Sequence, residues 1–357
     1  MKEKLRVGIL TSGGDCQALN AAMRGVALAL YEKNKNTEII GIENGYEGLI
    51  NGNCRSLTKD EFENILSLGG TILGSSRMPF KHINEPDENG VEKIPAMIKN
   101  YKKMGLDCLV VLGGNGSQKT ANLLSEKGLN VVSLPKTIDN DIAETDLTFG
   151  YASALEVAAE TIEKIKTTAA SHSRIFIVEI MGHKTGHLTL NAGIASGADV
   201  ILIPEMPFDI IAVAEKIKRN ELSGKNYSIV AVAEGAKTKQ DALLSKKEYK
   251  AKMGSLSISF SLASQLRMIC GKDVRVSIPG HVQRGGTPCP QDRILASRLG
   301  VAAAECIFKE KYGVMVALKN DKIVPVELSK VAGITKLVDI ESDTIKQAKA
   351  LGICFGE

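Results

Sequence analysis

Short apolar runs rich in β-branched residues alternate with amphipathic stretches along the chain. The runs predict β-strands, at residues 5–10, 37–42, 106–112, 130–134, 174–180, 199–203, 227–233 and 273–278. The amphipathic stretches predict helices, at residues 18–33, 117–127, 150–170, 209–220 and 289–311. Because the runs do not alternate apolar with polar side chains, we expect helices to bury both faces of each strand, as in a parallel sheet. The pattern is typical of a doubly wound α/β protein with mainly parallel sheets.

The number of strands predicts two domains. Strand and helix alternate through a chain of 357 residues, which is long for one sheet of this type. We expect two Rossmann-like, three-layer domains, the first ending near Gly150, where a long helical pattern begins. The polar stretches 83–93 and 236–252 are expected at the surface, the second of them partly helical.

Composition narrows the classes of partner. The net charge of +4 is small and suits an anionic small molecule, and no Lys/Arg run is interleaved with aromatic residues, which argues against nucleic acid. The seven cysteines are an odd number without a Cys-x-x-Cys pair, which argues against disulfides or a zinc site. With no signal-peptide pattern and no apolar stretch of membrane-spanning length, we expect a cytoplasmic protein without a membrane partner.

Two glycine-rich loops follow predicted strands. Thr11-Ser12-Gly13-Gly14-Asp15 and Gly113-Gly114-Asn115-Gly116-Ser117 each lead from a strand into a helix. Paired glycines let the backbone approach a ligand closely, and the free amides at a helix start favour an anion. Each loop alone is equally compatible with an ordinary tight turn, but two at neighbouring strand ends suit a polyphosphate. Neither matches a Walker A loop or the dinucleotide fingerprint.

Charged side chains follow the other strands. The segment 135–141 places Lys136 beside Asp139 and Asp141, which suits a general base with a charge-stabilising cation, although a solvated loop has the same composition. Arg174 and Arg275 offer guanidinium groups that match phosphate oxygens, and Glu234 can hold sugar hydroxyls. The residues alone therefore predict a phosphoryl-transfer or polyphosphate-binding enzyme with a phosphorylated, hydroxyl-rich partner.

Two histidines, His183 and His187, have i,i+4 spacing, which is a metal-ligand spacing on a helix. Gly186 intervenes, however, and no Glu follows His183, so the zinc-protease pattern is absent. We do not expect a metal site there.

Longer motifs resemble the phosphofructokinase family, in order from about residue 5 to about residue 320. They are residues 13–15 with Asn20-Ala21-Ala22-Met23-Arg24-Gly25, Gly69-Gly70-Thr71-Ile72-Leu73-Gly74-Ser75-Ser76-Arg77, Thr137-Ile138-Asp139-Asn140-Asp141, Met181-Gly182, and Gly280-His281-Val282-Gln283-Arg284-Gly285-Gly286. The resemblance implies a donor domain of residues 1–150 plus about 285–320, and a fructose 6-phosphate domain of residues 151–284 plus about 321–357. It implies transfer of a phosphoryl group to the sugar 1-hydroxyl in glycolysis.

The resemblance also implies residue roles. Asp139 would take the proton from the hydroxyl, with Lys136, Gly14 and Arg174 completing the catalytic set. The phosphoryl donor would be bound by Gly13, Gly14, Arg77, Met78, Gly114, Asn115, Gly116 and Ser117. Fructose 6-phosphate would be bound by Thr137, Ile138, Asp139, Arg174, Met181, Gly182, His183, Glu234, Arg275, His281 and Arg284. In this family two arginines complete a neighbouring subunit's site; Arg174 and Arg275 match them, which implies a homo-oligomer, usually a homotetramer.

Two positions bear on the phosphoryl donor. Gly116 resembles the ATP-dependent members, in which glycine leaves room for the α-phosphate, whereas Lys136 resembles the pyrophosphate-dependent members. We favour ATP, because a carboxylate at position 116 would exclude it by bulk and like charge, and glycine does not. Asn115 replaces a magnesium-associated carboxylate of the family. We still expect Mg²⁺ as cofactor, with Asn115 as the metal residue, because an amide oxygen can coordinate it.

The family is not fully matched elsewhere. His183 replaces an arginine, and Leu28 falls where bacterial allosteric members carry an effector-binding arginine, so the resemblance predicts no particular effector. The alternatives are a pyrophosphate-dependent enzyme, a relative of the NAD and lipid kinases, activity on another sugar phosphate such as sedoheptulose 7-phosphate, or a non-catalytic sugar-phosphate-binding subunit. The presence of Asp139 argues against the last.

Overall fold

The computed structural model describes residues 4–254 and 256–357. The chain forms two compact units, each made of two segments. The first unit comprises Met1–Ser153 and Arg284–Thr335, and the second comprises Ala154–Gln283 and Lys336–Glu357. Residues 321–335 therefore pack with the first unit, whereas the family resemblance assigned them to the second, and the chain returns to the second unit at Lys336.

The first unit is built on a seven-stranded sheet in the order β11-β10-β5-β4-β1-β2-β3. The five central strands run parallel, and the edge strands β3 and β11 are antiparallel to their neighbours. The strands are β1 (Leu5–Ser12), β2 (Thr37–Ile42), β3 (Cys54–Leu57), β4 (Cys108–Gly113), β5 (Val131–Pro135), β10 (Val314–Lys319) and β11 (Lys322–Glu327). All six residues of β4 are buried, as expected for a strand covered on both faces.

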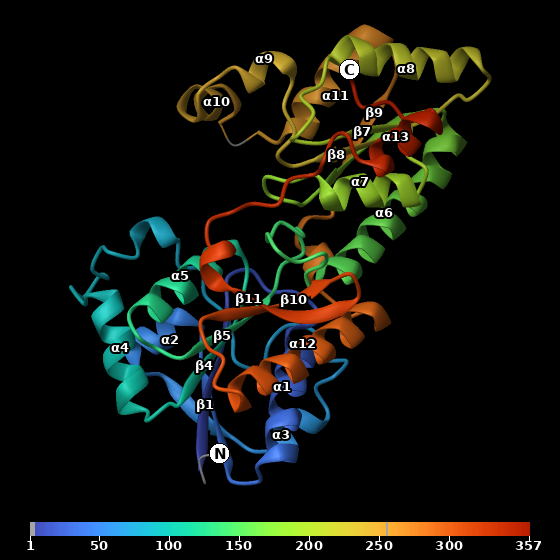
Figure 1. The fold of residues 1–357 in the computed structure, drawn as a ribbon. Coiled ribbons are helices and arrows are strands. Elements are labelled where there is room, and N and C mark those ends of the chain that lie inside the picture. The colour runs from blue at the N-terminus through green and yellow to red at the C-terminus, as the bar shows by residue number, and fades with distance from the viewer. Residues whose placement is uncertain (1–3, 255) are drawn as a thin grey trace. The chain divides into compact units, whose positions relative to one another are not determined.

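Helices cover both faces of this sheet (Figure 1). They are α1 (Leu19–Lys33), α2 (Tyr46–Asn51), α3 (Asp60–Glu63), η1 (Phe80–His82), α4 (Lys93–Lys103), α5 (Asn115–Glu126), α12 (Pro290–Phe308) and η3 (Leu328–Lys330). Helices α1 and α12 pack backbone to backbone, because a Cβ on Gly300 would lie 2.7 Å from the Ala22 oxygen. On the other face, α2, α4 and α5 bury Tyr46, Met97 and Leu124 in one apolar core. This places α12 against the helix that follows the first glycine loop.

The second unit contains a four-stranded parallel sheet in the order β7-β8-β6-β9. Its strands are β6 (Ile175–Ile180), β7 (Val200–Leu202), β8 (Ser228–Ala233) and β9 (Val274–Ser277). Its helices are α6 (Tyr151–His172), α7 (His187–Ala195), α8 (Ile210–Leu222), α9 (Lys239–Ala242), α10 (Lys246–Met253), α11 (Ile258–Cys270), η2 (Gly280–Arg284) and α13 (Asp343–Ala350), with α6 and η2 crossing the boundary between the units. The predicted fold class, two α/β sheets dominated by parallel strands, is confirmed.

Candidate active site

The first glycine loop connects β1 to α1 and is surrounded by positive charge. Gly13 has a positive φ of 87°, and its N–H donates to the Ser76 oxygen at 3.0 Å. A Cβ on Gly14 would lie 2.9 Å from Nη1 of Arg284 and 3.3 Å from Nη2 of Arg77, so two guanidinium groups converge on a backbone that carries no side chain. Arg284 also donates to the Asp15 oxygen at 2.9 Å. The two guanidinium groups and the bare backbone at Gly14 favour the binding of an anion at this turn.

Lys136 adds a third cation at the same turn. Its side chain is buried and donates to the Gly14 oxygen, and its own N–H donates to the Gly113 oxygen at 3.1 Å. Burial lowers the pKa of Lys136, with the positive charge of Arg284 contributing in the same direction. Lys136 thereby connects the end of β5 to both glycine-rich loops.

The second glycine loop begins α5 directly after β4. Ser117 donates from its hydroxyl to Oγ of Ser12 at 3.0 Å, which joins the two loops. Gly116 is exposed, and a Cβ there would meet nothing within 4 Å. The Asn115 amide donates to the Ile334 oxygen at 3.2 Å and to Oγ1 of Thr335 at 3.3 Å. Its Oδ1 is buried and accepts no hydrogen bond from the described residues.

The segment between β5 and α6 holds the predicted general base. The Asp139 N–H donates to Oγ1 of Thr137 at 3.0 Å, and the Thr148 hydroxyl donates to the Thr137 oxygen at 2.8 Å, so the loop is fixed from within. Asp139 is half-buried, while Ile138, which the resemblance assigned to the sugar phosphate, is fully buried.

Gly150, at the end of this segment, packs on Cys16. Gly150 has a φ of 100°, and a Cβ there would lie 2.6 Å from the Cys16 sulfur. Cys16 itself is fully buried, donates from its thiol to the Phe149 oxygen at 3.7 Å, and has its pKa raised by burial to about 12. Cys16 is therefore a packing residue, which lies between the first glycine loop and the segment that ends at Gly150.

In the second unit, the carboxyl ends of β6 and β8 meet. Glu234, which follows β8, accepts from the His183 N–H at 2.7 Å and from the Gly182 N–H at 3.2 Å through the same Oε1. His183 has a φ of 54°, and its side chain is exposed. The Met181 N–H donates to Oε1 of Gln283, a buried residue that the sequence pattern did not single out. His281 is exposed in η2.

The structure does not bring Arg174 and Arg275 to this place. Arg174 precedes β6 and Met181 follows it, so seven residue steps separate the two, about 23 Å at roughly 3.3 Å per residue. Arg275 pairs with Phe176 near the start of the same strand. Within this unit the two arginines lie near the amino-terminal ends of the parallel strands, whereas Met181 and Glu234 follow the carboxyl ends.

The His183–His187 pair is not arranged as a metal site. The Nε2–H of His187 donates to the Lys336 oxygen at 3.1 Å, and burial lowers the pKa of His187 to about 4. Across residues 4–254 and 256–357, no three His, Cys, Asp or Glu side chains are grouped to hold a metal ion. None of the helices within these ranges is long and apolar enough to cross a membrane.

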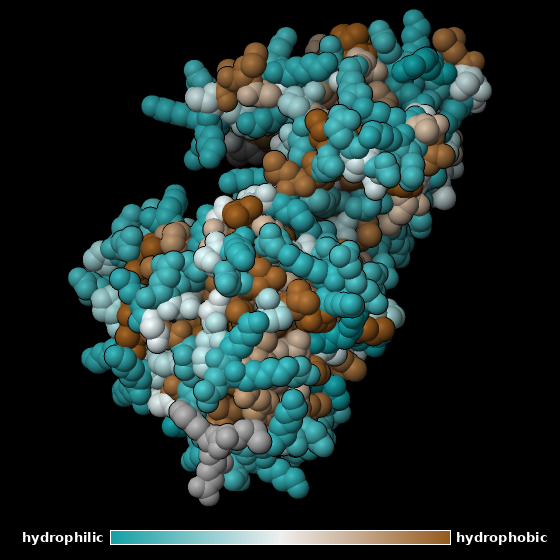
Figure 2. Space-filling model, viewed as in Figure 1, coloured by the Kyte–Doolittle hydropathy of each residue, from teal (hydrophilic) through white to brown (hydrophobic). Residues whose placement is uncertain are grey.

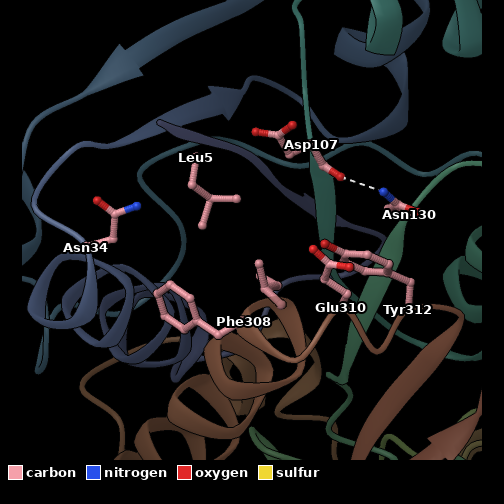
Figure 3. A pocket seen from close by; sticks show the side chains of 8 residues that line it. Leu5, Asn34, Asp107, Asn130, Phe308, Glu310 and Tyr312 are labelled. Atoms are coloured by element: carbon pink, nitrogen blue, oxygen red, sulfur yellow. Dashed lines mark hydrogen bonds between the residues drawn. The ribbon is translucent and has the colours of Figure 1, made fainter. Parts of the chain in front are cut away.

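A pocket of about 390 Å³ lies in the first unit, on the side of the sheet where β1 begins (Figure 3). It is lined by Leu5, Asn34, Asp107, Asn130, Ile307, Phe308, Glu310 and Tyr312. Leu5 begins β1, whereas the first glycine loop follows its end, so the pocket is remote from the converging cations. In open parallel sheets, ligands bind at the carboxyl ends of strands, which favours the glycine loops as the site.

Two α/β units, with glycine-rich loops at the carboxyl ends of parallel strands, form the arrangement in which α/β enzymes typically bind phosphorylated ligands. The sequence pattern of the phosphofructokinase family matches residues 6–307. The chain belongs to the phosphofructokinase family, and the resemblance seen in its motifs is confirmed.

Relatives agree along nearly the whole chain. It is 49% identical over 356 residues to "ATP-dependent 6-phosphofructokinase" of Spirochaeta thermophila, covering 98% of this chain and 97% of that protein. It is 44% identical over 373 residues to the protein of the same name from Propionibacterium freudenreichii subsp. shermanii, covering 99% and 100%.

Solved structures agree as well. Pichia pastoris phosphofructokinase in the T-state matches with a TM-score of 0.78 and 32% identity over 99% of this chain, although this chain spans only 37% of that one. Pyrophosphate-dependent phosphofructokinase from Nitrosospira multiformis matches with a TM-score of 0.82, covering 99% of this chain and 92% of that one, at 21% identity, which shows the fold alone.

Proposed function

We propose that this protein is an ATP-dependent 6-phosphofructokinase, which transfers the terminal phosphoryl group of ATP to the 1-hydroxyl of fructose 6-phosphate. The observation that carries the proposal is the convergence of Arg77, Arg284 and Lys136 on the Gly13–Gly14 turn. Phosphoryl transfer needs positioning and charge neutralisation more than covalent chemistry from the protein, and this turn supplies both. Relatives 42–49% identical to the chain carry that name.

Asp139 is the general base in this proposal. It follows β5 in a loop whose backbone is fixed by hydrogen bonds to Thr137 and from Thr148, so the Cα that carries the carboxylate is held at a defined place. It would accept the proton from the sugar 1-hydroxyl as that oxygen bonds to the γ-phosphorus of ATP and the bond from this phosphorus to the bridging oxygen breaks, which releases ADP. Lys136 and Gly14 would stabilise the charge on the transferred group, since a buried ammonium acts in a poorly screened environment.

The chain's residues fit Mg²⁺ at Asn115. Its buried Oδ1 is left without a hydrogen-bond donor among the described residues, while its amide nitrogen is fixed by Ile334 and Thr335. An amide oxygen is a ligand that magnesium accepts, directly or through water. Bound there with the donor phosphates, the ion would neutralise their charge; Asn115 would orient it.

Gly116 supports ATP as the donor. The space around its Cα is open, so nothing in the loop blocks a third phosphate. The second candidate is a pyrophosphate-dependent enzyme, which the buried Lys136 beside the Gly14 oxygen favours. We place ATP first, because a lysine adds attraction for either donor without excluding one.

The second unit would bind the sugar phosphate. Glu234 is fixed by two backbone N–H groups through Oε1, which leaves Oε2 to accept from a sugar hydroxyl. Arg174 and Arg275 lie near the amino-terminal ends of their strands, away from Glu234 at the carboxyl end of β8. They would therefore contact the substrate phosphate in a neighbouring subunit's site rather than in the site of their own subunit. The proposal therefore includes a homo-oligomer, with the homotetramer of the family resemblance as its form. It also includes a cytoplasmic location.

The test is formation of fructose 1,6-bisphosphate by the purified protein with magnesium, supplied with ATP or with pyrophosphate. Turnover with ATP alone supports the proposal. Turnover with pyrophosphate alone would make Lys136 the residue that sets the donor. No product with either donor would contradict the enzyme assignment.

A further inference from the structure

One carboxylate holds both of the predicted intersubunit arginines. Oδ2 of Asp273 forms an ion pair with Arg174, whose Nε lies 2.8 Å away. The same oxygen accepts a hydrogen bond from Nε of Arg275 at 3.1 Å, and Nη2 of Arg275 lies 2.9 Å from it in an ion pair. The sheet fixes this arrangement, because the Ile175 N–H donates to the Asp273 backbone oxygen at 3.1 Å and β9 pairs with β6 directly beyond.

The contacts leave one side of each guanidinium group open. An arginine has five N–H donors in a planar fork. Arg174 contacts Asp273 through Nε, so its two Nη groups remain available; Arg275 contacts it through Nε and Nη2, so Nη1 remains. No other hydrogen bond from these two side chains is formed within the described ranges. Their exposed fractions of 31% and 52% let a ligand reach those groups.

Charge balance explains why a carboxylate belongs between them. Two guanidinium groups gathered at one point repel each other, and a carboxylate between them offsets that repulsion. The three side chains together keep a net charge of one positive unit. The cluster therefore still attracts an anion, with N–H groups already turned toward solvent.

We infer that Asp273 is a positioning residue, which presents Arg174 and Arg275 together to the phosphate monoester of the sugar substrate. This inference rests on the proposed function, since it assigns the substrate phosphate to the arginine pair. Asp273 does not touch the substrate; it sets where the two guanidinium groups point. An ordinary surface ion pair would have the same distances but no effect on substrate affinity.

The variant Asp273→Asn tests the inference in the full-length enzyme. Asparagine keeps the size of the side chain but loses the charge that gathers the arginines. We expect the KM for fructose 6-phosphate to rise about tenfold, as for the loss of one charge-assisted contact, with kcat and the KM for ATP changed less than about twofold. The conservative variant Asp273→Glu should recover much of the affinity, and the melting temperature should stay at the wild-type value.

A matched control breaks a neighbouring ion pair that does not involve the arginines. Glu221 contacts Nζ of Lys272 at 3.0 Å, one residue before Asp273. Glu221→Gln should leave both KM values unchanged.

Two results would overturn the inference. A wild-type KM for fructose 6-phosphate in Asp273→Asn would make Asp273 an ordinary ion-pair partner, while leaving the proposed function standing. A lower KM would mean that the carboxylate competes with the substrate phosphate for the arginines. Absence of turnover in the wild-type protein with ATP would instead remove the proposed function, and this inference with it.

Discussion

Asp292 and Ser153 are joined by two hydrogen bonds, although 139 residues separate them in the chain. Oδ2 of Asp292 accepts from the Ser153 N–H at 2.8 Å and from its hydroxyl at 2.6 Å. Oδ1 accepts from the Gly150 N–H at 2.9 Å. Because Asp292 lies in the first turn of α12 and Ser153 in the first turn of α6, one buried carboxylate fixes the end of the loop that carries Asp139.

Replacing Asp292 with asparagine should destabilise the fold. The amide keeps one acceptor and turns an N–H group toward groups that already donate. We expect Asp292→Asn to lower the free energy of unfolding by about 1–3 kcal/mol, the usual penalty for buried polar groups left unsatisfied. Urea denaturation measures it. Asp321→Asn, which breaks an exposed ion pair with Arg298, is the control and should match wild type. An Asp292→Asn protein as stable as wild type would show that the network contributes little.

Asp139→Asn should abolish most of the turnover. The asparagine side chain cannot accept the hydroxyl proton, while the backbone bond from residue 139 to Thr137 is kept. We expect kcat to fall by a factor of about 10²–10⁴, with the dissociation constant for fructose 6-phosphate nearly unchanged. Glu144→Gln, which removes an exposed ion pair with Lys319, serves as the control. Near-normal turnover in Asp139→Asn would require a different base.

Gly116→Asp should separate the two donors. A side chain fits at Gly116 without a clash, and its backbone φ is not positive, so the variant should fold. The added carboxylate would repel the additional phosphate of ATP, and kcat/KM for ATP should fall at least about tenfold, while any rate with pyrophosphate changes less. Gly116→Ala adds a methyl group without charge and should retain ATP turnover. Equal losses with both donors in Gly116→Asp would contradict the donor argument.

His187 should make the protein acid-sensitive. Its pKa is lowered from 6.5 to about 4 by burial, so the folded state favours the neutral ring. The resulting stabilisation is fully present above pH 6.5 and is lost as the pH falls through 4. It amounts to at most about 3 kcal/mol.

Denaturation between pH 7 and pH 4 measures this effect. His187→Gln can still donate to the Lys336 oxygen, and its stability should fall less steeply over this range than that of wild type. His172→Gln, at an exposed position, should keep the wild-type slope. The same slope in wild type and His187→Gln would assign the acid sensitivity to other groups.

The sequence predicted the fold where strands are buried and apolar. Each of the eight predicted strands overlaps an observed one, because most of them are buried on both faces; β9, at the edge of its sheet, is the partly accessible exception. It missed β3, β10 and β11. β3 has four residues that are mostly accessible, and β11 contains Pro325, which weakens a strand prediction and is tolerated here because the strand lies at an edge. β10 is an apolar run that was overlooked.

The site was predictable only in part. The glycine loops follow strands directly, so local order along the chain places them at one edge of the sheet. The roles of Asp273 and Asp292 depend on partners from distant segments, such as Arg174 and Ser153. The spacing of residues along the sequence does not predict such pairs. The contact of Gln283 was not predicted for the same reason, since its Oε1 accepts from the N–H of Met181, a residue 102 positions earlier in the chain.

The burial of Cys16 has a practical consequence for work with thiol reagents and oxidants. Only a thiolate reacts with alkylating agents or peroxide at useful rates, and a group with a pKa of about 12 is almost entirely protonated at neutral pH. The thiol beneath the first glycine loop should therefore survive oxidative stress and maleimide treatment, while the exposed Cys54 on β3 reacts first. A dye attached at Cys54 would then report on the first unit while the Cys16 thiol stays unmodified.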